Sequence, residues 1–306
     1  MTRGIYLVAN KRSERESAHL IYSLRKVGCT LPIVLIPYDD NESEHPVLRA
    51  ETTRMRVRDF PAEGQEMLAR TARLWPETSS GLFRRFLSFY GPFDEFIYSD
   101  NDIVALGDWT ELFDYLGEND VVHADYEFTT EGKFNYKKPV EMRKLFGPAA
   151  LDSVLTAGHF VARKSERISP AFAMVPDWVA KNPGVAFHHD QAYFHLAILL
   201  AGLRTRNMCR APDNWPSTWA GDYANALAVV QTAQKREARL MHLHYSGWPP
   251  DGYHASEELY FSNLTDAKRF TLHLRAGLWH LSGLHYLTGQ FWRGLKRRSR
   301  KFLGKN

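Results

Sequence analysis

The segment Glu95-Phe-Ile-Tyr-Ser-Asp-Asn-Asp-Ile-Val-Ala105 joins an apolar strand pattern to two aspartates, Asp100 and Asp102, separated by one residue. Because successive side chains of an extended chain alternate in direction, both carboxylates point to the same side. Oxygen ligands of this kind suit Mg²⁺ or Mn²⁺, and such a cation would in turn hold substrate phosphates. On spacing alone, a polar turn that ends a strand is the favoured interpretation. A choice between metal site and turn therefore needs the rest of the chain.

Composition bounds the class of protein. The chain has 306 residues, of which 44% are hydrophobic and 24% charged, as in a globular protein with one large domain or two small ones. Its longest apolar run, residues 192–203, falls short of the roughly 18 residues needed to span a bilayer. The N-terminus lacks the apolar region and cleavage site of a signal peptide. Two cysteines, Cys29 and Cys209, make no disulfide framework, so a cytoplasmic location is expected.

Positive charge is concentrated near the C-terminus. Ten Lys or Arg residues and no Asp or Glu occur from Ala267 onward, although the net charge of the chain is only +4. Apolar residues such as Phe291 and Phe302 share a face of a helical pattern there, as in an interfacial amphipathic helix. We therefore divide the chain into a domain of residues 1–262 and a basic helical tail of residues 263–306. The tail is expected to contact an anionic membrane from its inner face rather than remain solvated. Aromatic residues among cations also suit nucleic acid, but no nucleic-acid partner is expected because the preceding residues are mildly acidic.

The first 37 residues follow a strand, helix, strand pattern. Residues 5–9 and 32–37 are apolar runs of strand length, and apolar residues recur at helical spacing between them. Ser13-Glu-Arg-Glu16 is a capping box expected to start the helix, and Gly28 is placed to end it. A parallel βαβ unit is therefore predicted. No Gly-x-Gly-x-x-Gly follows the first strand, which disfavours a nicotinamide or flavin dinucleotide site.

Polar residues follow these strands directly. In open α/β sheets ligands bind beyond the carboxyl ends of the strands, so Ala9, Asn10 and Asp39 are expected on the same rim as Asp100. A polar turn explains Asp39 equally well.

Further candidates occur along the chain. Arg84 and Arg85 precede the Asp-x-Asp strand and are able to neutralise a phosphate, although a solvated surface pair is the commoner case. Gly158 lies in an expected strand, residues 155–162, where a missing side chain lets a ligand or another backbone approach closely. Asp190 stands near the start of an apolar helix, either as its cap or, if it faces the rim, as a base or hydroxyl acceptor.

His242 and His244 are two residues apart in an expected strand, residues 239–247, and so lie on one face. Neutral imidazole is a good ligand for Mn²⁺. A lone His-x-His is weak evidence for a metal site. Together with Asp-x-Asp it would complete a three-ligand site with positions left for diphosphate oxygens.

These landmarks resemble the GT-A glycosyltransferases, most closely the branch around glycosyltransferase family 8, the glycogenin and galactosyltransferase-like enzymes. They occur in the expected order: residues 4–9, Phe83-Arg-Arg-Phe86, residues 96–104, residues 156–160, Asp190-Gln191 and His244-Tyr-Ser-Gly247. The sequence is also similar to a group of uncharacterised bacterial proteins with Gly-Pro-Phe-Asp-Glu-Phe before Asp-x-Asp, here residues 91–96. The resemblance implies an α/β fold, a Rossmann-like three-layer sandwich with a mixed, mostly parallel central sheet, here followed by the helical extension.

The resemblance also implies roles for individual residues. Asp100 and Asp102 would bind Mn²⁺ or Mg²⁺ with His244 as the third ligand. The donor, a nucleoside-diphosphate sugar, would contact a set of eight positions. These are Ala9, Asn10, Asp39, Arg84, Arg85, Asn101, Gly158 and Gly247. Asp190 and Gln191 would be the catalytic pair facing the donor sugar and the acceptor.

The function implied is a metal-dependent glycosyltransferase that moves a sugar, with UDP-sugars favoured, to a hydroxyl of a glycan or lipid-linked acceptor in cell-surface polysaccharide synthesis. Retention of configuration is favoured by the resemblance, and inversion would need a base for which Asp190 is the candidate. A sugar-phosphate nucleotidyltransferase is disfavoured because residues 10–16 contain no glycine. A non-catalytic nucleotide-sugar or glycan-binding module is allowed, since Trp248-Pro-Pro250 stands where the family commonly has a lysine and Pro-Trp.

Overall fold

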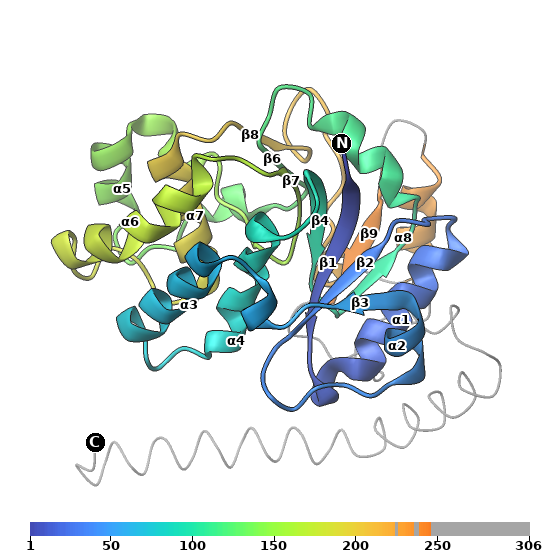
Figure 1. Ribbon diagram of the computed structural model, residues 1–306. Helices are drawn as coiled ribbons and strands as arrows, with labels where there is room; N and C mark the ends of the chain where they lie inside the picture. The colour runs from blue at the N-terminus through green and yellow to red at the C-terminus, as the bar shows by residue number, and fades with distance from the viewer. Residues whose placement is uncertain (224–225, 236–238, 246–306) are drawn as a thin grey trace, which may run out of the picture.

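Figure 1 shows the computed structural model of the chain, which describes residues 1–223, 226–235 and 239–245. Three expectations lie outside these described residues, namely Gly247 as a donor-binding position, the segment Trp248-Pro-Pro250 and the helical tail of residues 263–306. The domain boundary at residue 262 therefore stays a prediction. Within the described residues, no helix is long and apolar enough to cross a bilayer.

Seven strands form the central sheet in the order β3-β2-β1-β4-β7-β6-β8. They are β1 (Arg3–Ala9), β2 (Ile33–Pro37), β3 (Thr52–Arg54), β4 (Glu95–Ser99), β6 (Val121–His123), β7 (His159–Arg163) and β8 (Thr205–Asn207). The first four run parallel, β7 runs antiparallel to β4 and β6, and β8 is parallel to β6. The mixed, mostly parallel sheet expected from the sequence is confirmed.

Helices cover both faces of this sheet (Figure 1). The α-helices are α1 (Glu14–Lys26), α2 (Pro46–Glu51), α3 (Ala62–Leu74), α4 (Ser80–Phe83), α5 (Pro139–Phe146), α6 (Ile168–Lys181), α7 (Asp190–Ala201) and α8 (Ala226–Ala233). Short 3-10 helices are η1 (Lys11–Ser13), η2 (Val57–Asp59), η3 (Arg84–Tyr90), η4 (Trp109–Tyr115), η5 (Glu127–Thr130), η6 (Pro148–Leu151) and η7 (Ala220–Asp222).

Alternate residues of β1 explain the layers. Ile5 and Leu7 belong to a buried core that includes residues of α1, whereas Tyr6 and Val8 belong to a second core that includes residues of α3, α6 and α7. A strand buried on both faces reads as the continuous apolar run found at residues 5–9. The three-layer sandwich predicted from the sequence is therefore confirmed.

The start of α1 differs from the expectation. Asn10 caps η1, the turn that leads into α1: its Oδ1 accepts hydrogen bonds from the backbone N–H groups of Arg12 and Ser13 at 3.0 and 3.3 Å. Ser13 Oγ in turn accepts the Asn10 N–H at 3.2 Å. The predicted box of Ser13 and Glu16 is wrong, because the Ser13 hydroxyl is used one turn earlier and makes no cap bond to α1.

A second, two-stranded sheet pairs distant parts of the chain. Strand β5 (Ile103–Ala105) lies antiparallel to β9 (His242–His244), with Ile103 opposite His244. The backbone N–H of Tyr245 donates to the Asp102 carbonyl at 2.8 Å. This pairing places the end of β9 directly beside the residues that leave β4.

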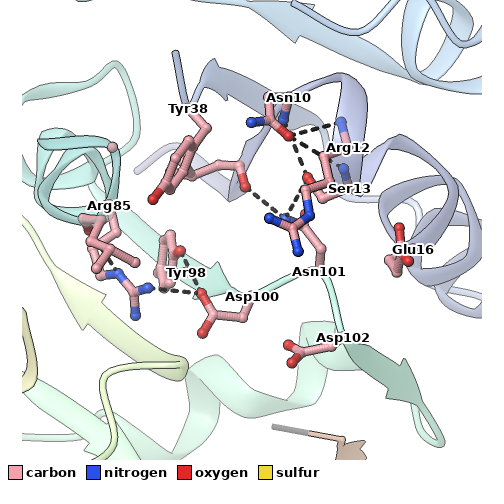
Figure 2. A pocket seen from close by; sticks show the side chains of 13 residues that line it. Asn10, Arg12, Ser13, Glu16, Tyr38, Arg85, Tyr98, Asp100, Asn101 and Asp102 are labelled. Atoms are coloured by element: carbon pink, nitrogen blue, oxygen red, sulfur yellow. Dashed lines mark hydrogen bonds and ion pairs between the residues drawn. The ribbon is translucent and has the colours of Figure 1, made fainter. Parts of the chain in front are cut away.

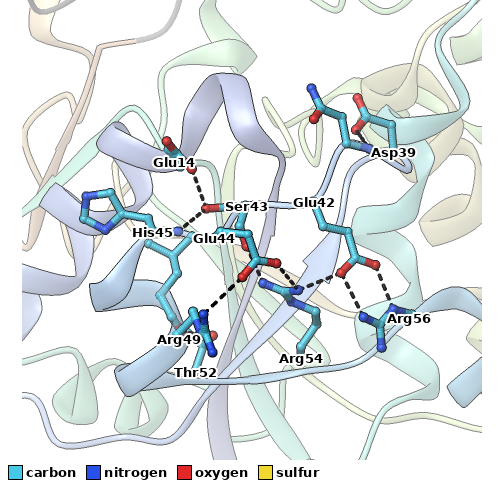
Figure 3. Close-up of polar contacts among 12 residues, drawn as sticks. Glu14, Asp39, Glu42, Ser43, Glu44, His45, Arg49, Thr52, Arg54 and Arg56 are labelled. Carbon is cyan, nitrogen blue, oxygen red and sulfur yellow. Dashed lines mark hydrogen bonds and ion pairs between the residues drawn. The ribbon is translucent and has the colours of Figure 1, made fainter.

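Salt bridges hold the loop that follows β2 (Figure 3). The Glu42 carboxylate accepts from Arg54 Nη1 at 2.6 Å and from Arg56 Nε at 2.7 Å, while Ser43 Oγ donates to Glu14 at the start of α1 at 2.8 Å. These contacts fix the loop against both β3 and α1. The loop thereby presents Asp39 to the carboxyl end of β1.

The segment Gly91-Pro-Phe-Asp-Glu-Phe96 has a packing explanation. A Cβ atom on Gly91 would lie 2.0 Å from Tyr6 Oη, and one on Gly4 would lie 2.2 Å from the Phe93 ring. Two glycines on neighbouring segments therefore each receive an aromatic ring from the other segment. The backbone of Gly91 is extended, with φ of −82°, so only space demands glycine there.

We predict that Gly91→Ala destabilises the protein by about 1–3 kcal/mol, the usual cost of overpacking a rigid core. The Tyr6 ring is fully buried and cannot turn aside without displacing Phe96, which it contacts edge-to-face at 5.3 Å between ring centroids. Urea unfolding measures the free energy difference. Adding Tyr6→Phe, which removes the closest atom, is expected to recover part of the loss. Equal stability of Gly91→Ala and the wild type would contradict the packing argument.

Candidate functional site

The two aspartates and His244 converge in space. Asp100 follows β4, Asp102 precedes β5, and His244 ends β9. One ligand atom from each of the three lies within 4.8 Å of the others, and Asp102 Oδ1 is 3.2 Å from His244 Nε2. Both aspartates are partly exposed while the imidazole is buried. The arrangement offers two oxygens and one nitrogen to a cation that is open to solvent on one side.

These residues fit a divalent cation. His244 Nε2 is buried and has no well-aligned hydrogen bond, although it faces Asp102. Buried polar atoms without partners are uncommon in folded proteins. Two carboxylates and one imidazole are a donor set that Mn²⁺ accepts, and a cation between them would satisfy the nitrogen.

Gly158 makes room for this convergence. It lies one residue before β7 rather than within it, which corrects the expected strand bounds. A Cβ atom on Gly158 would lie 2.5 Å from His244 Cε1 and 3.0 Å from Asp100 Oδ2. The Gly158 carbonyl also accepts the Asp100 backbone N–H at 2.7 Å. The groups that approach this glycine closely are thus two of the three candidate ligands.

Arg85 is buried between two carboxylates. Its guanidinium lies 3.3 Å from Asp100 and 3.1 Å from Asp190, and it donates to the Ala157 carbonyl at 2.8 Å. Only 8% of its side chain is exposed. The cation also lies over the Tyr98 ring, 5.1 Å from the centroid, and the Tyr98 hydroxyl donates to Asp100 at 2.7 Å (Figure 2). Every partner that a buried arginine needs is therefore present.

The charges of the three candidate ligands depend on one another. Burial raises the pKa of Asp100 above its ordinary value in spite of Arg85. Burial acts the same way on Asp102, but His244 outweighs it and leaves the pKa of Asp102 below its ordinary value. Burial lowers the pKa of His244, whereas the two aspartates raise it. The net result is a pKa above the ordinary value. Asp102 and His244 thus stabilise each other's charged forms, and a bound cation would replace the imidazole proton.

Two cavities meet at Asp100 and Arg85. The first has a volume of about 410 Å³, and Figure 2 shows side chains around it. Its lining includes Asn10, Arg12, Ser13, Glu16, Tyr38 and Asp102. The second has a volume of about 690 Å³. Its lining includes Asp125, Glu127, Asp190, Gln191, Trp219 and His244.

Of the residues predicted at the ends of β1 and β2, Asn10 lines the first cavity. Ala9 is buried, and its carbonyl accepts the Tyr38 N–H at 2.8 Å. Asp39 contacts the cavity through Asn10, whose Nδ2 donates to it at 2.6 Å. The carboxyl ends of the parallel strands therefore do meet at one rim.

Arg84 and Asn101 have structural partners. Arg84 Nη1 donates to the Pro37 carbonyl at 2.6 Å, and Arg84 is absent from the linings of both described cavities, unlike its neighbour Arg85. Asn101 lines the first cavity and braces it, because its side chain donates to the Val8 carbonyl at 2.7 Å.

Asp190 and Gln191 line the second cavity at the start of α7. Of the two alternatives for Asp190, the helix cap is wrong, since His189 is the cap and accepts the Ala192 N–H at Nδ1. The Asp190 carboxylate is instead directed to Arg85. Gln191 Nε2 donates to Glu127 at 3.3 Å.

The wall residues that sequence reasoning missed include Tyr98, Asp125, Glu127 and Trp219. Tyr98 is two residues before Asp100 and so shares its face of the strand. Asp125 and Glu127 follow the carboxyl end of β6, where the rule that predicted Asp39 also applies. Nothing in the sequence around Trp219 marks it, because its place depends on a backbone bridge to the distant residue His244 of β9.

Asp125 is a buried carboxylate with its own partner. His123 Nδ1 lies 3.0 Å from it, and the Glu127 N–H donates to it at 3.0 Å. Burial works to raise the pKa of Asp125, but His123 and the backbone N–H groups of Glu127 and Thr156 outweigh burial and hold this pKa below its ordinary value. Asp125 is therefore charged and paired at the wall of the second cavity.

Comparisons with known proteins rest on structure. No protein-family model matches the sequence, and no curated protein matches it. The solved structure of the bifunctional glycosyltransferase WbbM is 14% identical with a TM-score of 0.61, over 90% of this chain and 51% of that chain. Galactosyltransferase LgtC, solved with donor and acceptor sugar analogs, is 17% identical with a TM-score of 0.55. The match covers 87% of this chain and 99% of that chain. GlyE of Streptococcus pneumoniae is 16% identical with a TM-score of 0.50, over 92% and 64%.

This chain thus spans about half of WbbM and nearly all of LgtC. At such low identity the similarity concerns the fold. The order of strands, the helices on both faces and the structural matches agree on one architecture. The described part of the chain has the GT-A glycosyltransferase fold that the sequence resemblance implied.

Proposed function

We propose that the chain is a metal-dependent glycosyltransferase that moves a sugar from a nucleoside-diphosphate sugar, UDP-sugars first, to a hydroxyl of a glycan or lipid-linked acceptor. One observation carries the proposal, the convergence of Asp100, Asp102 and His244 where two cavities meet. The solved proteins that share the fold are glycosyltransferases, and LgtC was solved with donor and acceptor sugar analogs.

Each cavity receives a role in this proposal. The first, bordered by Asn10 and Tyr38, takes the nucleoside, and the second, bordered by Asp190 and Gln191, takes the acceptor. Both share Arg85 and Asp100, so the bond to be broken lies between them. A Mn²⁺ or Mg²⁺ ion held by the two aspartates and His244 would supply positive charge for the leaving diphosphate.

Arg85 supplies fixed positive charge at the same place. Its guanidinium is held by Asp100, Asp190 and the Ala157 carbonyl, so it needs no rearrangement to favour negative charge that develops nearby. Preorganised charge of this kind contributes to catalysis because little reorientation is required during the reaction. We assign to Arg85 the contact with the donor and to Arg84 only support of the β2 end.

Retention of configuration is part of the proposal. Inversion needs a carboxylate base beside the acceptor hydroxyl, and the candidate is Asp190. Its carboxylate is engaged with Arg85 at 3.1 Å. Gln191, next to it, carries an amide that cannot take the proton. This arrangement disfavours Asp190 as the base, whereas Glu127 and Asp222 line the same cavity, so retention is proposed from the family resemblance.

We predict that the wild type binds Mn²⁺ and that Asp102→Asn lowers the affinity at least tenfold, about 1.4 kcal/mol, because one charged ligand is lost. Electron paramagnetic resonance of free Mn²⁺ during a titration measures this. Asp114→Asn, an exposed aspartate outside both cavities, is the matched control and should bind as the wild type does. Unchanged binding in Asp102→Asn would remove the metal from the proposal.

Turnover tests the function itself. We expect the wild type with Mn²⁺ to release UDP from at least one member of a UDP-sugar panel, and Asp102→Asn to lose most of that activity. Tight binding of UDP and Mn²⁺ without hydrolysis or transfer would favour the non-catalytic binding module. Failure to bind any nucleoside diphosphate would contradict both.

We further predict that Gly158→Ala weakens Mn²⁺ binding although it removes no ligand. The new methyl group would occupy space within 3.0 Å of both His244 Cε1 and Asp100 Oδ2, so at least one ligand must shift. The same Mn²⁺ titration measures the loss, and thermal unfolding separates it from a general loss of stability. Wild-type affinity in a folded Gly158→Ala protein would show that this close contact is unimportant for the ion.

The basic tail is assigned to membrane contact. In this part of the proposal residues 263–306 form an amphipathic helix on the inner face of an anionic membrane, as their composition indicates. We expect the full chain to float with vesicles containing phosphatidylglycerol, and a chain lacking residues 290–306 to float much less. Neutral phosphatidylcholine vesicles are the control. Equal flotation of both chains on anionic vesicles would dismiss the tail's role.

A further inference from the structure

Carboxylates of the second cavity differ in whether an arginine or histidine side chain pairs with them. Asp190 and Asp100 share Arg85, and Asp125 pairs with His123. In the described part of the chain, Glu127 and Asp222 form no ion pair with Lys, Arg or His. Glu127 accepts a hydrogen bond from Gln191 at 3.3 Å, and Asp222 accepts one from the Ser217 hydroxyl. Two acceptors with spare lone pairs therefore line the same cavity.

Among the described residues that line the cavity, carboxylates outnumber arginines and lysines. Burial, followed by the charge of Asp125, raises the pKa of Glu127 to about 7. A carboxyl that is hard to ionise beside other carboxylates marks a place where further negative charge is unfavourable. The described residues that line the cavity include one arginine, Arg85, whose charge is already balanced by Asp100 and Asp190. The cavity therefore offers no unpaired cation from an arginine or lysine to an anionic group.

Aromatic rings complete the wall. Tyr126 and Trp219 are each 40% exposed and Phe134 is 64% exposed, although large rings are usually buried, and all three line this cavity. The Trp219 ring packs against Gly221, where a Cβ atom would lie 2.4 Å from Cζ2. One side of the indole is thus supported by backbone. An exposed aromatic face attracts the weakly positive C–H groups of a sugar ring.

We propose that the second cavity selects an uncharged sugar as acceptor, with ring hydroxyls donating to Glu127 and Asp222 and the C–H face against Trp219, and that it rejects sugars bearing a carboxylate or phosphate. The inference rests on the proposed function in treating this sugar as the acceptor. An ionised carboxylate only accepts hydrogen bonds and so suits hydroxyl donors, and Glu127, with a pKa of about 7, is ionised above that pH. An anionic sugar would bring like charge to a cavity whose lining arginine, Arg85, is already paired with two carboxylates.

Binding of matched sugars tests the inference. Saturation-transfer NMR, with the full chain, Mn²⁺ and UDP present, compares the α and β methyl glycosides of glucose and galactose with the corresponding methyl glucuronides and galacturonides. Each pair differs only in a carboxylate. We expect at least one neutral glycoside to bind and its uronide partner to bind at least tenfold more weakly.

Variants connect this preference to the two carboxylates. Glu127→Gln and Asp222→Asn keep the shape of the side chain and remove its charge. Each variant should therefore reduce the difference in affinity between neutral and anionic sugars. Trp219→Leu should weaken the binding of neutral and anionic sugars alike. Glu166→Gln, an exposed residue outside both cavities, is the control and should leave that difference unchanged.

Several outcomes overturn the inference. One is that the uronides bind as tightly as the neutral glycosides. A second is that Glu127→Gln and Asp222→Asn leave the difference in affinity between neutral and anionic sugars unchanged. A third is that the protein binds UDP and Mn²⁺ but none of the glycosides. The last result would leave the proposed function standing. If the wild type binds neither UDP nor Mn²⁺, the proposed function itself is contradicted. Failure of the inference and failure of the proposed function are therefore distinguishable.

Discussion

Pairing of β5 with β9 is the constraint on which the candidate site depends. Ile103 lies opposite His244, and the Tyr245 N–H donates to the Asp102 carbonyl at 2.8 Å. Backbone hydrogen bonds therefore set the distance between the imidazole and the carboxylates, which side-chain rotation alone could not do. Gly158 completes the arrangement because any side chain there would meet His244. A site built on paired strands is held more rigidly than one built on loops.

Charge balance accounts for the rest of the site. A buried arginine is costly unless carboxylates and backbone carbonyls surround it, and Arg85 has two carboxylates and a carbonyl. Both carboxylates serve a second purpose: Asp100 is a candidate ligand and Asp190 lines the second cavity. The two cavities are consequently coupled through one guanidinium. This coupling explains why a helix-capping role for Asp190 gives way to an ion pair.

The cavities differ in chemistry although they share a wall. The first has neutral and mixed polar groups such as Asn10, Arg12 and Glu16, whereas the second combines carboxylates with exposed aromatic rings. Such a division suits one charged ligand, balanced by a cation, and one polar ligand without charge. Glu127 belongs to the second cavity and not to the candidate metal ligands, whereas the backbone of Trp219 forms a bridge with His244.

Local patterns in the sequence determined the first βαβ unit, the Asp-x-Asp segment at the end of β4 and the His-x-His strand, because alternation and helical spacing act over a few residues. They also indicated the rim, since the carboxyl ends of parallel strands meet on one side. Only the tertiary structure decided that Asn10 rather than Ser13 caps the first turn, that Asp190 faces Arg85, and that Glu127 and Trp219 share a cavity. These outcomes depend on contacts between segments far apart in the chain, and burial and charge balance at such contacts have no signature in the spacing of any one segment.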